Sequence, residues 1–208
     1  MPRIDDYKNT LGIAKEEFRK KDHRNTALDS GAEYRPHPAG GTIELLVLNR
    51  PITITWPEGE IMAPARAREL SLQEQGLIMH YLIQAKGVPL TETWITFREI
   101  PSGEFYYSAF VKRAKEPLVK AFGDRPDLLV ELGLKMGGTK GKEGDASLYF
   151  KAFPRIPVSL VLWAGDEEFP PDGNLLFDAS ISKYLSAEDI AVLSGMVVYP
   201  LIGTADKK

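Results

Sequence analysis

The chain has 208 residues, 43% of them hydrophobic, and a formal charge of −3, so it can bury one large core and has no overall attraction to nucleic acid or anionic membranes. The absence of cysteine excludes disulfides, thiolate catalysis and any zinc or iron–sulfur site ligated by cysteines of this chain. The N-terminus has no apolar signal core, and we find no run of the ~20 apolar residues that a membrane-spanning helix needs. We therefore expect a cytoplasmic protein without a membrane span.

The first element expected is an amphipathic helix over about residues 4–24, packed on the body of a single domain that covers 1–208. Ile4, Leu11 and Phe18 belong to a stripe of apolar residues spaced three or four apart. A loop rich in glycine and proline should follow at 30–41.

Two strands at 42–48 and 52–56 should form a hairpin, because the second run alternates apolar and hydroxyl residues. A helix then begins after Ser71, with Glu74 in the third position of a reciprocal capping box. By helical angle, His80 lies away from the apolar stripe of this helix, on the side of Gln73 and Gln84.

A third strand is expected at 93–97 and an aromatic-rich helix at 104–122, bent or restarted at Pro117 because proline removes a helix hydrogen bond. A short helix at 127–136 and a glycine- and lysine-rich loop at 137–144 come next. This loop lacks the Gly-Lys-Ser/Thr of a phosphate-binding loop.

Strands at 146–153 and 158–163 precede an acidic bend, and a further apolar run, 175–177, leads to Asp178, which should bond nearby backbone at the end of a strand. Ser186 and Asp189 are the cap and third residues of a last helix, which should end at Pro200. Because strands and helices are mixed without regular alternation, we predict an α+β fold with a mainly antiparallel sheet of about five to six strands packed against helices.

Aromatic side chains suggest a ligand pocket, since rings beside a few polar groups are typical of pocket linings. A bound small molecule or cofactor would contact six residues: His80, Trp94, Tyr106, Tyr107, Trp163 and Phe169. We expect the ring-rich segment and the acidic bend to line one common hollow.

The acidic bend also suggests a metal site. Asp166, Glu167 and Glu168 follow a buried strand directly, and adjacent carboxylates suit a hard divalent cation such as magnesium or calcium. The alternative, a solvated loop after a buried strand, is the interpretation that the same three residues favour.

Several stretches resemble a known family, above all Leu-Trp-Ala-Gly-Asp-Glu-Glu-Phe-Pro-Pro at 162–171, with 176–185 and 188–191. The family is an uncharacterised one of anaerobic bacteria and archaea, named only as a domain of unknown function. Some relatives carry an added cysteine-rich iron–sulfur segment, which this chain lacks. The resemblance implies an association with corrinoid or other tetrapyrrole chemistry and supplies no catalytic residues.

Three functions therefore stay open. The first is an accessory protein that binds a small molecule or cofactor, tetrapyrroles and corrinoids included. The second is a divalent-metal-dependent enzyme that uses the carboxylates of Asp166–Glu168. The third is a structural protein that forms homodimers or other homo-oligomers through its apolar last helix.

Overall fold

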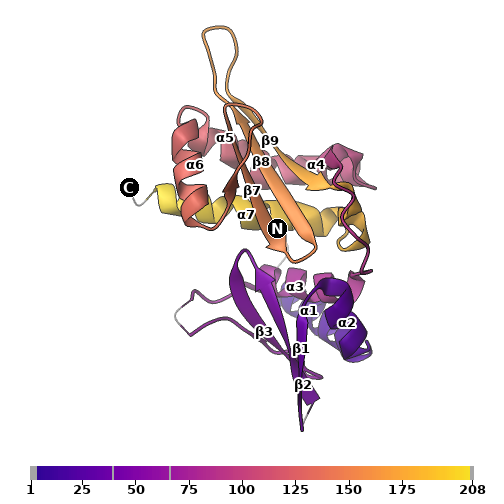
Figure 1. The fold of residues 1–208 in the computed structure, drawn as a ribbon. Helices are drawn as coiled ribbons and strands as arrows, with labels where there is room; N and C mark the ends of the chain where they lie inside the picture. The colour runs from indigo at the N-terminus through magenta and orange to yellow at the C-terminus, as the bar shows by residue number, and fades with distance from the viewer. Residues whose placement is uncertain (1–3, 39, 66, 207–208) are drawn as a thin grey trace.

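Two antiparallel sheets and the helices packed on them make up the protein (Figure 1). The computed structural model describes residues 4–38, 40–65 and 67–206. The strand order is β1-β2-β3-β4 in one sheet and β5-β9-β8-β7-β6 in the other. The predicted α+β class with antiparallel pairing is confirmed, and the strands are divided between two sheets of four and five strands.

The N-terminal half holds the four-stranded sheet and three helices. The helix expected at about 4–24 ends at Arg19, and Asp22 caps a second helix, in which its side chain accepts a hydrogen bond from Asn25 N at 2.8 Å. The prediction of a loop at 30–41 is wrong in part. Gly31, with φ of 70°, ends that helix, and β1 begins two residues later at Glu33. The elements are α1 (Ile4–Arg19), α2 (His23–Ser30), β1 (Glu33–His37), β2 (Gly40–Val47), β3 (Arg50–Trp56), β4 (Ile61–Met62) and α3 (Leu72–Gln84).

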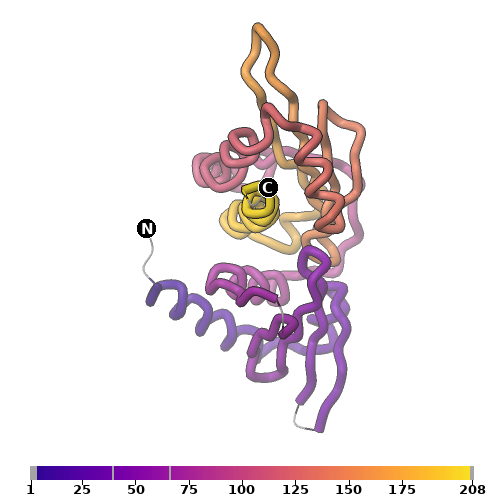
Figure 2. Tube along the Cα trace, turned by 90° about the vertical axis from the view of Figure 1, so that its left-hand side faces the viewer, coloured from indigo at the N-terminus to yellow at the C-terminus, as the bar shows by residue number. Residues whose placement is uncertain are grey.

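The C-terminal half holds the five-stranded sheet, with α7 lying along the inner side of the helical layer (Figure 2). Its strands are β5 (Trp94–Thr96), β6 (Thr139–Lys140), β7 (Ala146–Phe153), β8 (Ile156–Trp163) and β9 (Asp172–Asp178). Its helices are η1 (Phe97–Glu99), α4 (Gly103–Phe110), η2 (Val111–Lys115), α5 (Glu116–Phe122), α6 (Pro126–Lys135), η3 (Ala179–Lys183) and α7 (Ala187–Ala205).

The helix expected at 104–122, bent or restarted at Pro117, is divided into α4, η2 and α5, with Pro117 in the first turn of α5. The segment η2 is a π-helical turn in which Glu116 N–H donates to Val111 O, five residues back. Proline has no N–H to donate to Arg113 O, and the wider turn lets the chain continue into α5 without that bond.

α7 begins as predicted, with Ser186 and Asp189 forming a complete capping box. The predicted end at Pro200 is wrong, because the helix runs on to Ala205 and Thr204 Oγ1 donates to Pro200 O at 2.9 Å. By length and composition α7 could cross a membrane, contrary to our expectation that no run is long and apolar enough. However, 61% of its most apolar 18-residue stretch is buried within the protein, as in a core helix.

Buried contacts join the two halves. The fully buried Tyr81 of α3 donates from its hydroxyl to Ser30 O at 2.6 Å and accepts from Arg155 N at 3.2 Å. Leu48 N donates to Ala152 O at 3.0 Å, which ties the β2–β3 turn to β7. Buried apolar residues of both sheets belong to one hydrophobic cluster, and α3 therefore lies between α1 and α7 at the junction (Figure 2).

Candidate functional site

A histidine–carboxylate pair connects α3 to the start of α7. His80 Nδ1 lies 2.7 Å from Asp189 Oδ1, and the His80 side chain is 30% exposed while that of Asp189 is 11% exposed. Because an ionised carboxylate only accepts, Nδ1 carries the proton in this bond. No described residue provides a hydrogen-bond partner for His80 Nε2.

Asp189 is held by two further donors. Ser186 Oγ donates to Asp189 Oδ2 at 2.7 Å, and Gln84 Nε2 approaches the same oxygen at 3.3 Å. The carboxylate is therefore fixed from the helix start and from α3, and it in turn fixes the orientation of the imidazole.

The pair shifts the pKa of both partners toward the charged forms. The hydrogen bond that His80 donates to Asp189 raises the pKa of His80 above its ordinary value, against an opposing effect of burial. Burial raises the pKa of Asp189, but the hydrogen bonds from His80, Ser186 and Gln84 and the charge of His80 together outweigh it, so the pKa lies below the usual value. A histidine held in this way is suited to donate a proton or a charged hydrogen bond from Nε2.

His80 lines a cavity of about 430 Å³ between α1, α3 and the start of α7. Its walls combine apolar side chains with hydroxyls, including Tyr7, Thr10, Leu11 and Val192. The predicted face of α3 is confirmed, because Gln73, His80 and Gln84 all line this cavity. The volume lies within the range of about 300–1,000 Å³ that is usual for small-molecule sites.

A second cavity of about 730 Å³ adjoins the first. Gln73 and Val192 line both, so the two cavities are neighbours along the side of α7, and we refer to them together as the groove. The second cavity is also lined by Arg68, Glu74 and Arg113.

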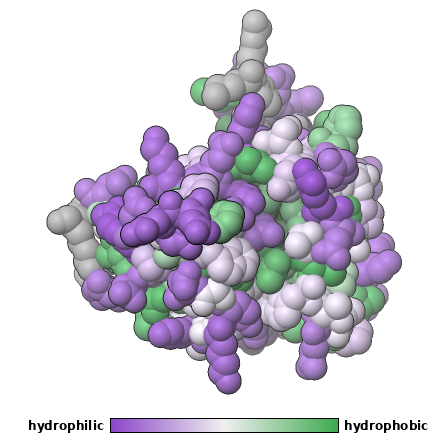
Figure 3. Space-filling view, turned by 90° about the horizontal axis from the view of Figure 1, so that it is seen from above, coloured by the Kyte–Doolittle hydropathy of each residue, from purple (hydrophilic) through white to green (hydrophobic). Residues whose placement is uncertain are grey.

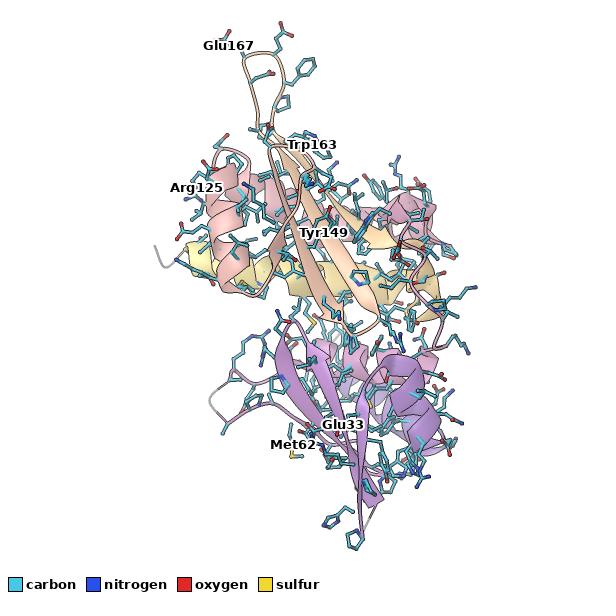
Figure 4. All side chains as sticks on the ribbon, in the orientation of Figure 1. Glu33, Met62, Arg125, Tyr149, Trp163 and Glu167 are labelled. Atoms are coloured by element: carbon cyan, nitrogen blue, oxygen red, sulfur yellow. The ribbon has the colours of Figure 1, made fainter. Side chains whose placement is uncertain are left out.

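The acidic bend lies elsewhere. It forms the loop between β8 and β9, which projects beyond the body of the protein at the end far from α3 (Figures 1 and 2), and Glu167 lies at its tip (Figure 4). Asp166 Oδ1 accepts from Glu168 N at 2.8 Å and Phe169 N at 2.7 Å, so this carboxylate organises the loop itself. The face from which the loop rises is mainly hydrophilic (Figure 3).

The predicted metal site gains no further ligands from neighbouring elements. Within residues 4–38, 40–65 and 67–206, no group of three or more His, Cys, Asp or Glu side chains could hold a metal ion. Binding of a cation by Asp166, Glu167 and Glu168 stays a prediction, and these residues are solvent-exposed.

The predicted aromatic residues are spread over the C-terminal half. Trp163, at the end of β8, is 44% exposed, and Phe169, on the projecting loop, is 67% exposed. Trp94 packs against Tyr149 with ring centroids 5.5 Å apart, and Arg98 lies 4.0 Å over the ring of Tyr107.

Tyr106 alone of these aromatics connects to the His80 cavity, because its hydroxyl lies 3.4 Å from Glu188 Oε2 and Glu188 lines that cavity. Tyr106 on α4 is therefore linked to the cavity that His80 lines, whereas the projecting loop lies far from α3 (Figure 1), so the expected common hollow does not form.

Sequence reasoning missed the partner of His80. It gave Asp189 only the role of a helix cap, which the structure confirms. The signal available was the pairing of two polar residues on otherwise apolar helices, but their separation of 109 residues hides the contact.

Comparison with known proteins finds one matching protein family. A family model described as "Domain of unknown function (DUF3786)" matches residues 22–199, which include α3, α7 up to Tyr199 and the projecting loop. No curated protein and no solved structure matches the chain.

Proposed function

The chain belongs to the DUF3786 family, a domain of unknown function, and from that starting point we propose that it binds a small molecule in the cavity between α1, α3 and α7. His80 contacts the ligand through Nε2. The observation that carries the proposal is the Nδ1 to Asp189 bond of 2.7 Å at the wall of a cavity of ligand size, with Nε2 left without a protein partner among the described residues.

The chemistry of the cavity supports a ligand that is partly apolar. Leu11, Leu77 and Val192 offer contact area, while Tyr7, Ser186 and the His80 pair offer polar groups that can fix an orientation. If His80 had only a structural role, its hydrogen bond to Asp189 would be sufficient, and no cavity would be needed beside it.

A ligand screen by thermal stability, with His80→Gln and His37→Gln as variants, tests the proposal. His80→Gln removes the charged donor of the cavity, whereas His37 lies exposed at the far end of β1. A true ligand should raise the melting temperature of the wild type and His37→Gln and have a much weaker effect on His80→Gln. A ligand that stabilises all three proteins equally would place binding outside this cavity.

A second candidate is ligation of a metal that arrives inside a macrocyclic cofactor, such as a haem or a corrinoid. Histidines that ligate metals commonly donate their other N–H to a carboxylate, as His80 does to Asp189. A macrocycle supplies its own ring nitrogens, so one imidazole from the protein suffices. Among the residues that line the cavity, His80 would therefore hold the metal of such a group through Nε2.

Absorption spectra of the protein with haem and with hydroxocobalamin test this second candidate. Ligation should shift the Soret or corrin bands in the wild type and not in His80→Ala. Unchanged spectra in the wild type, or shifts that persist in His80→Ala, would remove the macrocycle and leave the small-molecule proposal in place.

A further inference from the structure

The second cavity contains a cation, Arg113, that has no carboxylate partner within the part of the chain that the structure describes. Arg113, on the π-helical turn η2, is half-buried and lines the cavity of about 730 Å³. None of the described residues forms an ion pair or side-chain hydrogen bond with it. Arg68, in contrast, is bound by both oxygens of Glu74, at 2.8 and 2.5 Å.

The charges of Arg68 and Glu74 cancel, so Arg113 leaves this end of the groove with a net positive charge. A half-buried guanidinium has lost part of its hydration and presents a planar set of donors. A carboxylate or phosphate group matches that set with two parallel hydrogen bonds.

Close packing between η2 and α7 holds Arg113 at this place. Gly195 of α7 faces the turn, and a Cβ there would lie 3.3 Å from Arg113 O. The missing N–H of Pro117 leaves Arg113 O without its usual helix bond, and the absence of a side chain at Gly195 lets this part of η2 approach α7.

One stripe of α7 runs through both cavities. Asp189, Val192, Met196 and Tyr199 are spaced three or four residues apart, which places them on one face of the helix. Asp189 belongs to the His80 end, and Met196 and Tyr199 belong to the Arg113 end. With a rise of ~1.5 Å per residue, the seven residues from Asp189 to Met196 span about 10 Å.

We infer that the groove takes an elongated ligand with an anionic end, a carboxylate or a phosphate, which Arg113 binds at the opposite end of the groove from the group that contacts His80. This inference rests on the proposed function, since it names the chemical class of the same ligand. The anionic subsite itself requires only Arg113 and the second cavity.

Titration with sodium acetate and with sodium phosphate, at constant ionic strength set by sodium chloride, tests the subsite. Two-dimensional NMR should follow the Arg113 side-chain Nε–H signal and the backbone amides of Gly195 and Gly203, which line the cavity. We expect saturable shifts of these signals. The anion that binds more tightly identifies the end group.

Two variants complete the test. Arg113→Gln should weaken binding of the preferred anion at least about tenfold, because hydrogen bonds to a charged group are lost. The exposed neighbour Lys112, changed to Gln, removes the same charge from the same turn and should leave the affinity within about twofold. Circular dichroism and melting temperature confirm that both variants fold.

Equal affinity in wild type and Arg113→Gln, or shifts in neither titration, would overturn the subsite. His80→Gln should bind the anion as the wild type does. If the anion binds at Arg113 while no ligand responds to His80→Gln in the thermal screen, the proposed function fails and the subsite stands.

Discussion

At the scale of single residues, Asp189 combines three roles in one carboxylate. It completes the capping box of α7, receives Ser186 Oγ, and orients His80. Burial of a carboxylate is costly unless it is paired and hydrogen-bonded, and Asp189 is both. The site and the start of α7 therefore depend on the same atom group.

The pH dependence of stability should reveal the pair. The folded pKa of His80 is raised above 6.5, so its contribution is fully present below that value and is lost as pH rises through the folded pKa. The folded pKa of Asp189 is lowered below 3.8, so its contribution is lost only as pH falls through that lower value. The pair thus stabilises the protein most between about pH 4 and 6.5.

His80→Gln should therefore lower the free energy of unfolding by roughly 1 kcal/mol at pH 5.5 and by clearly less at pH 9. Urea denaturation at the two pH values measures the difference, with His37→Gln as a control. A loss that is the same at both pH values would show that the charge of His80 contributes nothing.

Replacement of the cap residues should separate capping from the pairing with His80. Ser186→Ala removes the N-cap and should cost about 1 kcal/mol of unfolding free energy. Asp189→Ala also strips His80 of its partner and should cost more, about 2–3 kcal/mol. Chemical denaturation near pH 6 measures both. In the background of His80→Gln the excess cost of Asp189→Ala should shrink, and an unchanged excess would contradict the pairing.

Helical angle placed Gln73, His80 and Gln84 on one face, because such a face depends only on residues within α3. The facing residue on α7 depends on how two helices pack, which no local pattern encodes. Sequence alone did not show that Asp166–Glu168 lie on a projecting loop, since a projecting loop and a pocket wall have the same polar composition.

At the scale of elements, close approach decides what each helix tolerates. Gly133 of α6 lies where a Cβ would come 2.1 Å from Leu148 Cδ1, and Leu148 of β7 is fully buried. A Cβ at Gly12 of α1 would meet nothing within 4 Å. The two glycines look alike in sequence and differ only in what packs on them.

Alanine at the two positions should have opposite effects. Gly12→Ala gains helix propensity and should raise the free energy of unfolding by about 0.5–1 kcal/mol. Gly133→Ala gains the same propensity but forces α6 away from β7, and should lower it by about 1–3 kcal/mol. Urea denaturation of the two variants measures both signs. Stabilisation by Gly133→Ala would mean that α6 does not pack this tightly.

Local signals also explain which element boundaries were predicted. The starts of α3 and α7 were found because Ser71 and Ser186 cap them within four residues of sequence. The end at Pro200 was wrong because buried packing of α7 outweighs one missing hydrogen bond. The strand β1 was missed because an edge strand, which is mostly exposed, has no alternating pattern.

At the scale of the whole molecule, the two sheets share one apolar cluster and are joined by the hydrogen bonds of Tyr81. Strand content was predictable because apolar alternation is local. The division of the strands between two sheets was not, since partners such as β5 and β9 are far apart in the chain.

We propose that both halves unfold as one cooperative unit, and tryptophan fluorescence can test it. Trp56 lies in the first sheet, and Trp94 and Trp163 lie in the second. Variants that keep only Trp56 or only Trp163, with phenylalanine at the other two positions, should show coincident urea midpoints. Circular dichroism of each variant should give the same midpoint. An earlier transition for Trp56 alone would reveal two independent domains.

The loop between β8 and β9 projects away from α3 and from the junction between the halves (Figures 1 and 2). Loop tips of this kind accept inserted sequence with little loss of stability. A peptide tag inserted at Glu167 would allow the protein to be immobilised on a sensor chip through the end opposite α3, the helix that carries His80. Immobilised in that way, the protein could be used to capture its natural ligand from cell extracts.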